Sequence, residues 1–188
     1  MWKRFSNLKK IWKMGSNQIL TIFGRFVILV LLQVIVLNNI NLVGYINPYI
    51  YILFIVLYPL DGNKTTLIFL SFLLGLSIDI FENSGGVHAA ASVFIAYVRD
   101  FVLKYSFGVS YEYNNVKLNK ATVSEKITYL GSIILFHHII LFSLEIFSFN
   151  HMLLLLKSTL FSGVFSFILI YGSIVLFSRK VSWEKLFL

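Results

Sequence analysis

Residues 67–100 read LIFLSFLLGLSIDIFENSGGVHAAASVFIAYVRD. Two apolar runs, each long enough to cross a bilayer, flank a short polar turn at 82–86. Gly85 and Gly86 permit positive φ angles and therefore a tight reversal of the chain. This stretch predicts two consecutive transmembrane helices, at about 65–82 and 87–104.

The rest of the chain has the same character. Of its 188 residues, 58% are hydrophobic and 13% are charged, whereas soluble domains average about 25% charged residues. Long apolar runs alternate with short polar breaks, which suits lipid as the solvent. We predict one all-α integral membrane domain of six transmembrane helices. The predicted helices are 19–37, 46–60, 65–82, 87–104, 128–147 and 152–178.

The distribution of lysine and arginine predicts the orientation of these helices. The outer loops 38–45, 83–86 and 148–151 contain neither residue. Lysines and arginines instead occur in the N-terminal segment, the turn before the third helix, the stretch 105–127 and the C-terminus. By the positive-inside rule, both termini are predicted to lie in the cytoplasm.

Both ends of the chain are basic. Residues 1–18 place Trp2, Phe5, Leu8 and Trp12 on one side of a helix and most lysines on the other. This pattern predicts an amphipathic segment on anionic lipid, although a disordered basic tail is the alternative. The six-span domain then covers 19–178, and 179–188 is a basic cytoplasmic tail. The net charge of +8 is assigned to lipid contact, and no nucleic acid partner is expected.

Several chemistries are not predicted. The chain has no cysteine, which excludes disulfides, zinc–thiolate sites and cysteine catalysis. It lacks Walker, GxSxG, GxGxxG and HExxH motifs, so neither enzymatic activity nor a cofactor is expected. His137 and His138 are adjacent and cannot both aim at one metal from a regular helix, so no metal site is predicted.

Polar residues inside spans each need a reason. Asp79 lies about one turn before the glycine turn, where it could accept hydrogen bonds from the turn's amides or face His88. A structural tie and a cavity-facing site for an ion or ligand are both open. Glu145 and Lys157 flank the last outer hairpin and predict an interhelical ion pair.

Small residues predict two helix-contact faces. One combines the alanines and Ser92 of the fourth helix. The other is the stripe Ser158, Ser162 and Ser166, which repeats every four residues. The stripe is open to two interpretations, contact with this chain's own helices or with those of a partner.

The third and fourth spans carry a resemblance. The helix end Gly75-Leu76-Ser77-Ile78-Asp79, the turn with Gly85 and Gly86, and the small-residue helix reaching Tyr97 resemble the rod-shape-determining protein MreD family over about residues 58–104. The resemblance implies a non-enzymatic scaffold subunit of the bacterial cell-elongation complex, in the cytoplasmic (inner) membrane. It implies binding to the single-span protein MreC and, directly or indirectly, to MreB, a SEDS polymerase and a class B transpeptidase of peptidoglycan synthesis.

The resemblance also implies a fold similar to the substrate-binding subunits of energy-coupling-factor transporters. The alternative function is therefore a substrate-binding membrane subunit of a small-molecule, vitamin-type transporter. Such a subunit needs a cavity near the outer surface with converging polar groups. Asp79, His88 and Glu145 are the candidates for those groups.

Overall fold

The computed structural model describes residues 16–40, 46–60, 62–108, 121–146 and 152–184. The first helix is α2 (Ser16–Leu31), continued by the π-helical turn η1 (Leu32–Val36) and the 3₁₀ turn η2 (Leu37–Asn39). The others are α3 (Ile52–Val56), α4 (Lys64–Glu82), α5 (Val87–Phe107), α7 (Val123–Ile146) and α8 (Met152–Glu184). The predicted amphipathic segment 1–18 lies almost wholly outside the described residues, as do 109–120 of the inner stretch and 185–188 of the tail.

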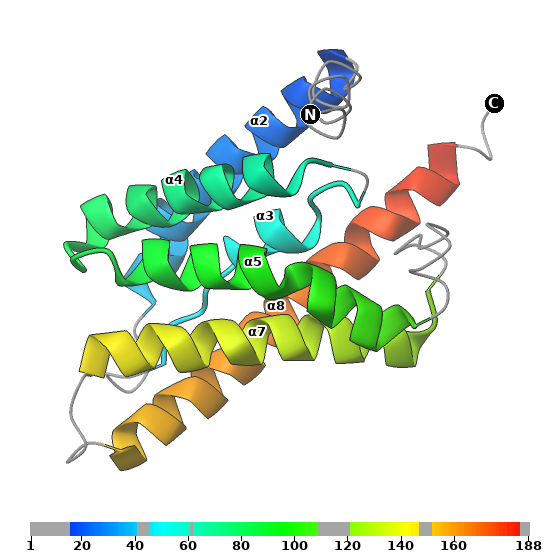
Figure 1. Cartoon of the computed structure of the whole chain (residues 1–188). Coiled ribbons are helices and arrows are strands. Elements are labelled where there is room, and N and C mark those ends of the chain that lie inside the picture. Colours follow the sequence, from blue (N-terminus) through cyan, green and yellow to red (C-terminus); the bar gives the residue numbers. More distant parts are fainter. Residues whose placement is uncertain (1–15, 41–45, 61, 109–120, 147–151, 185–188) are drawn as a thin grey trace, which may run out of the picture.

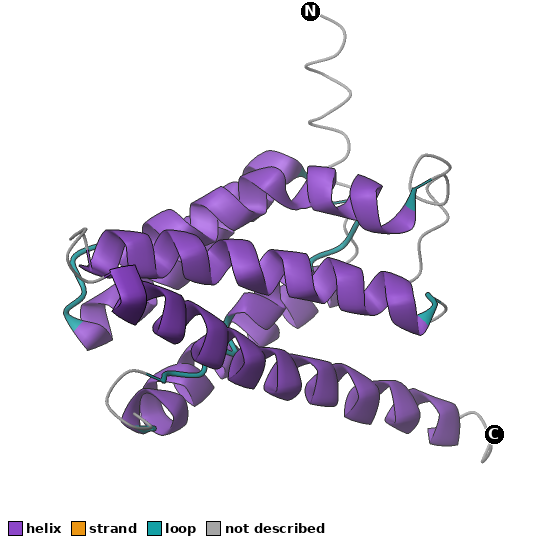
Figure 2. Ribbon diagram, turned by 90° about the horizontal axis from the view of Figure 1, so that it is seen from below, coloured by secondary structure: helices purple, strands orange, loops and turns teal. Residues whose placement is uncertain are grey.

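The helices form one bundle. In Figure 1, α4, α5 and α7 lie side by side, with α2 and α8 crossing them obliquely and α3 among them. Figure 2 shows the same bundle turned by 90°. Within the described residues, four helical stretches are long and apolar enough to cross a membrane. They are Gln18–Asn39, Lys64–Glu82, Val123–Ile146 and Met152–Leu176. The predicted class, an all-helical multi-pass membrane protein, is confirmed.

Helix α5 is the central helix, packed against both α4 and α7. Its 21 residues extend about 31 Å, close to the thickness of a hydrocarbon core. It is less apolar than the other long helices because Arg99, Asp100 and Lys104 lie towards its C-terminal end. Arg99 is 2% exposed, so the bundle shields its charge from the lipid.

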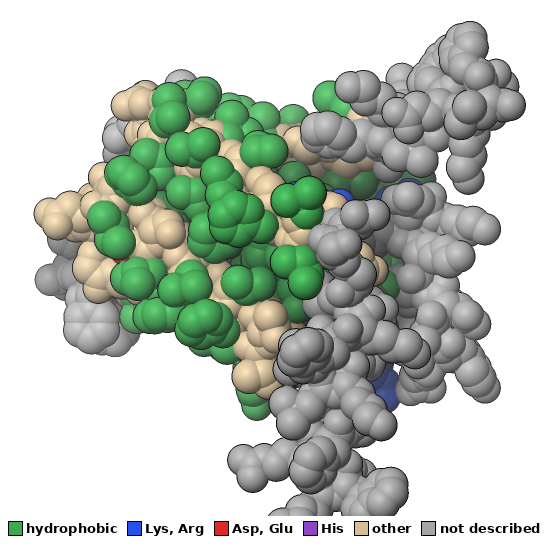
Figure 3. Space-filling model, turned by 90° about the horizontal axis from the view of Figure 1, so that it is seen from above, with side chains coloured by type: hydrophobic (Ala, Val, Ile, Leu, Met, Phe, Trp, Pro, Cys, Tyr) green, Lys and Arg blue, Asp and Glu red, His purple; other side chains and the backbone are tan. Residues whose placement is uncertain are grey.

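Polar side chains lie inside the bundle within a mainly hydrophobic core, and large apolar side chains cover its outside. Large hydrophobic residues such as Phe23, Phe72, Phe101 and Leu160 are exposed. Figure 3 shows one face of the molecule, on which hydrophobic side chains predominate. Among the residues whose burial the structure describes, twelve buried side chains are polar or charged. They are Gln33, Ser71, Asp79, His88, Ser92, Arg99, His137, His138, Ser158, Thr159, Ser162 and Ser166. This arrangement suits a lipid solvent, which requires polar groups to find partners within the protein.

The close approach of α4 and α5 depends on Gly75. A Cβ atom at Gly75 would lie 2.5 Å from both Ala89 Cα and the His88 carbonyl oxygen. The alanine face predicted for the fourth helix is confirmed at Ala89, which is buried in this contact. Ala91 is also buried, whereas Ala90 is exposed. Small residues here allow two backbones to approach without side chains between them.

The predicted helix 46–60 is wrong. Only the five residues of α3 are helical, and the chain from 46 to 50 is not. Pro48 has no N–H to donate, and its ring disfavours the helical conformation at Asn47. Pro59 follows the other end of α3. The prolines therefore limit the helix at both ends, and neighbouring side chains bind the backbone groups that it leaves free.

Candidate functional site: the polar network around α3

The non-helical chain before α3 is held by side chains of two other elements, η1 and α8. Asn47 N donates to Ser162 Oγ at 3.1 Å, and Tyr49 N donates to Ser166 Oγ at 2.8 Å. Ile50 N donates to Gln33 Oε1 at 2.9 Å, and Gln33 Nε2 donates to the Pro48 carbonyl at 3.0 Å. Since an unpaired backbone group in a membrane interior costs several kcal/mol, these four bonds permit non-helical chain there.

The carbonyl groups at the C-terminal end of α3 are bound as well. Arg99 Nη2 donates to Tyr58 O at 2.5 Å, and Arg25 Nη1 donates to Leu57 O at 3.1 Å. Tyr129 Oη donates to Val56 O at 3.3 Å and accepts from Arg99 Nε at 3.1 Å. Helices α2, α5 and α7 thus supply the donors that the last turn of a short helix needs.

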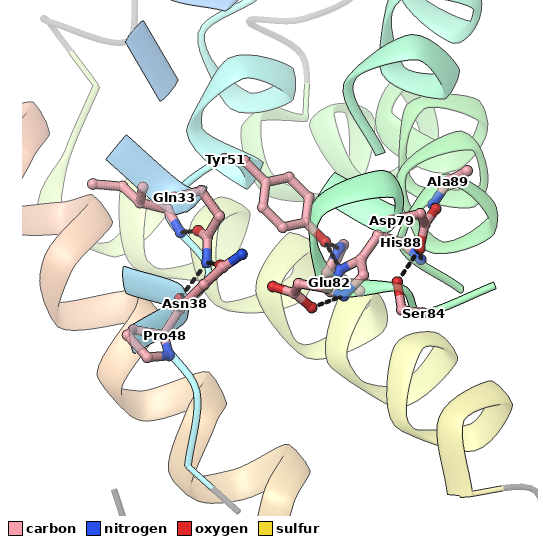
Figure 4. A network of polar contacts seen from close by, with 11 residues as sticks. Gln33, Asn38, Pro48, Tyr51, Asp79, Glu82, Ser84, His88 and Ala89 are labelled. Atoms are coloured by element: carbon pink, nitrogen blue, oxygen red, sulfur yellow. Dashed lines mark hydrogen bonds and ion pairs between the residues drawn. The ribbon is translucent and has the colours of Figure 1, made fainter. Parts of the chain in front are cut away.

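A chain of four side chains crosses the middle of the bundle. Tyr51 Oη lies 2.8 Å from His88 Nδ1 and 2.8 Å from His137 Nε2. His88 Nε2 lies 2.7 Å from Glu82 Oε2. In Figure 4, Tyr51 and Glu82 both point toward His88. The chain therefore links α3, α4, α5 and α7 from a partly exposed carboxylate to a fully buried histidine.

One arrangement of protons satisfies the first three members of this chain. If the carboxylate of Glu82 accepts from His88 Nε2, then neutral His88 accepts the Tyr51 proton at Nδ1. The Tyr51 oxygen then accepts from His137 Nε2, which leaves His137 Nδ1 as an acceptor. His137 Nδ1 is buried and has no partner in the described part of the protein. The network can hold and reorient protons, and it ends without a partner at His137.

Asp79 ties the α4–α5 hairpin together. Its carboxylate accepts from His88 N at 3.0 Å, Ala89 N at 2.8 Å and Ser84 Oγ at 2.5 Å. The first two donors are free amides of the first turn of α5, where a negative charge is stabilised by the helix dipole. Gly85 and Gly86 have positive φ angles, as predicted. This geometry agrees with the structural interpretation of Asp79.

A pocket of about 420 Å³ lies beside the network. It lies between η1, η2, the end of α4 and the non-helical chain before α3. Its lining is Gln33, Val34, Leu37, Asn38, Asn39, Asn47, Tyr49, Phe81 and Glu82. The ring of Tyr49 packs against two histidine rings. Its centroid lies 5.3 Å from that of His88 and 5.5 Å from that of His138. The pocket and the buried network therefore share Gln33, Tyr49 and Glu82 as their boundary.

The predicted ion pair between Glu145 and Lys157 is wrong. Neither side chain takes part in an ion pair within the described ranges, and both are exposed. The buried face of α8 carries Ser158, Thr159 and Ser162, so Lys157 projects from the helix about 100° away from Ser158. Glu145 likewise lies on the outer surface of α7. Asp79 and His88 are brought together, but neither Glu145 nor Lys157 joins them.

The serine stripe contacts this chain's own elements. Ser158, Ser162 and Ser166 are all buried. Ser162 and Ser166 bind the backbone before α3, and Ser166 Oγ also lies 3.3 Å from His138 Nε2. His138 Nδ1 donates to the Ile134 carbonyl, so its Nε2 accepts. Within the described residues, no three His, Cys, Asp or Glu side chains converge to hold a metal.

Sequence reasoning missed Gln33, Tyr49, Tyr51 and Tyr129. One signal was available, because Gln33 is a single polar residue inside the apolar run from Phe26 to Leu37. The tyrosines gave none, since aromatic residues are common in apolar spans. Comparison of the chain with protein-family models, curated proteins and solved structures gives no match. The functional argument therefore rests on the geometry of the site and on the resemblance described above.

Proposed function

We propose that this chain is a non-enzymatic scaffold subunit of the bacterial cell-elongation complex in the cytoplasmic membrane, with an MreC-like single-span protein as its direct partner. In this proposal the chain crosses the membrane six times, with α3 and its flanking segments as the second crossing, and both termini are cytoplasmic. We propose that the chain also interacts, directly or through that partner, with MreB, the SEDS polymerase and the class B transpeptidase.

The observation that supports this proposal is the role of the residues that carry the resemblance. Gly75 permits the helix contact, and Asp79 caps α5 through His88 and Ala89. Gly75 and Asp79 therefore hold the hairpin together, and this structural role supports the scaffold proposal. The surface left for a partner is then the outer faces of the helices.

A groove between α7 and α8 is the most suitable of those faces. It has a volume of about 470 Å³, and its lining is Ile127, Thr128, Gly131, Ser132, Ile134, Leu135, Thr159, Leu160, Gly163, Val164 and Phe167. A Cβ atom at Gly131 would meet nothing within 4 Å. Transmembrane helices associate where small residues let backbones approach, so we place the partner's single helix here.

Co-expression and affinity purification test this proposal. The tagged chain is expected to recover an MreC-like single-span protein in near-stoichiometric yield from mild detergent. Gly131→Leu is expected to lower that yield at least fivefold by filling the groove, which corresponds to about 1 kcal/mol. The matched control is Gly24→Leu on α2, where a Cβ also meets nothing within 4 Å. Equal yields from the two variants would remove the groove from the proposal, and no recovery by the unchanged chain would reject the partner.

The pocket beside Glu82 favours a second candidate, a substrate-binding membrane subunit of a small-molecule, vitamin-type transporter. Its volume falls within the range of ligand sites, and polar groups converge on it from η1, η2, α4 and the chain before α3. Of the residues expected to line such a cavity, none of Asp79, His88 and Glu145 does so. Recovery of two ATPase subunits and a coupling membrane protein with the tagged chain would favour this candidate over the scaffold.

A further inference from the structure

The pocket beside Glu82 carries negative charge. Among the described residues that line it, Glu82 alone has an ionisable acidic or basic group, apart from the Tyr49 phenol, and none is a lysine or arginine. We propose that this pocket binds a small organic cation, an amine that carries an apolar group. The amine would be the substrate class of the second candidate function. Its transport rests on that candidate, whereas its binding rests on the pocket alone.

The carboxylate of Glu82 is positioned to accept an ammonium group. Its Oε2 atom is fixed by His88 Nε2 at 2.7 Å, while the side chain remains 23% exposed. A carboxylate has about four acceptor positions, so the bond to His88 leaves most of them available. In a partly desolvated site, an ammonium–carboxylate bond is stronger than a neutral hydrogen bond. The same carboxylate would repel an anionic ligand.

The other lining residues suit the remainder of such a ligand. The amides of Asn38, Asn39 and Asn47 offer further donors and acceptors, and the rings of Tyr49 and Phe81 offer aromatic faces or edges. Ring faces attract cations by about 0.5–2 kcal/mol. Val34 and Leu37 complete an apolar wall. The carboxylate, amides and apolar side chains together define an amphipathic amine of moderate size.

Binding of phenethylamine tests this inference against its neutral isostere 2-phenylethanol. The purified full chain in detergent is titrated with each compound by calorimetry. Phenethylamine is expected to bind saturably and at least tenfold more tightly than 2-phenylethanol. Glu82→Gln is expected to remove that preference. Glu145→Gln is the matched control because it removes a carboxylate near the same end of the bundle without altering the pocket lining.

Two further variants keep the test decisive. Val34→Phe leaves Glu82 and its bond to His88 intact but fills the pocket, so it is expected to weaken phenethylamine binding even if Glu82→Gln fails to fold. Val164→Phe in the α7–α8 groove is its size-matched control. Equal affinities for the two compounds, or no saturable binding up to about 10 mM, would overturn the inference. The inference would also be overturned if Glu82→Gln and Glu145→Gln showed the same preference for phenethylamine over 2-phenylethanol. Because no partner is present, these outcomes leave the scaffold proposal unaffected.

Discussion

At the scale of single residues, the protein depends on side chains that bind several groups at once. Tyr51 bridges two histidines through one hydroxyl, and the Asp79 carboxylate accepts three hydrogen bonds. Gln33 binds a donor and an acceptor of the chain before α3. Removing any one of these side chains leaves more than one buried polar group unpaired, and such groups cost more than the net value of the bonds.

Tyr51→Phe is expected to destabilise the protein by about 2–4 kcal/mol. The substitution keeps the ring but leaves His88 Nδ1 and His137 Nε2 without their shared partner, at about 1–3 kcal/mol for each buried group. Thermal unfolding of the purified variant in detergent measures the loss. Tyr105→Phe, at a 72% exposed position, serves as the control and is expected to unfold like the unchanged protein. Similar unfolding temperatures for all three proteins would mean that the network contributes little.

Asp79→Ala is expected to lower stability by about 2–4 kcal/mol, because the His88 and Ala89 amides lose their acceptor inside the bundle. Protein level in the membrane should fall accordingly, while partner binding per folded molecule should be unchanged. Asp100→Asn is the control, since the Asp100–Lys64 pair is half exposed and exposed pairs contribute about 0–1 kcal/mol. An Asp79→Ala protein that is abundant and stable but no longer binds the partner would contradict this structural role.

At the scale of elements, two features determine how the helices pack. They are the α4–α5 contact and the hydrogen bonds by which neighbouring helices hold α3. Helix α3 is too short to be stable alone, and it exists because side chains from α2, α5 and α7 bind its last carbonyls. The contact at Gly75 brings α4 and α5 close enough for Asp79 to reach the first amides of α5. These two features hold the polar network in place.

Gly75→Ala is expected to destabilise the protein by about 1–3 kcal/mol, because the added methyl group would overlap the backbone of α5 and force the two helices apart. Gly24→Ala provides the matched control. Its methyl group would meet nothing within 4 Å, so improved helix propensity should make it neutral or stabilising by up to about 1 kcal/mol. Urea or heat unfolding of both variants gives the comparison. A neutral Gly75→Ala would show that α4 and α5 can separate without loss.

At the scale of the whole molecule, the proposed topology makes a labelling prediction. The chain contains no cysteine, so a single introduced cysteine reports its own location. Asn39→Cys, at the end of η2, should react with a membrane-impermeant maleimide on intact spheroplasts. Ser124→Cys, at the start of α7, should react only after permeabilisation. Both positions are exposed, so access from water decides the result. Labelling of both from the same side would reject the proposal that α3 and its flanking segments form a crossing.

The sequence by itself determined the class of protein and most of its long helices. Apolar runs specified the helices now seen as α2, α4, α5, α7 and α8, because hydrophobic length is a local property of the chain. The paired glycines predicted the turn at 82–86 for the same reason, since positive φ angles depend on residue type. The cytoplasmic location of the termini and the outer location of the loops remain predictions.

Only the tertiary structure decided what the polar residues do. The brevity of α3 depends on Pro48 and Pro59, but its survival in a membrane depends on Gln33, Arg99 and the serines of α8, which are distant in the sequence. Glu145 and Lys157 were wrongly paired because their depth could be estimated from spacing, whereas the directions of their side chains depend on how the helices rotate against each other. Hydrogen bonds between helices require that rotation, and no local pattern encodes it.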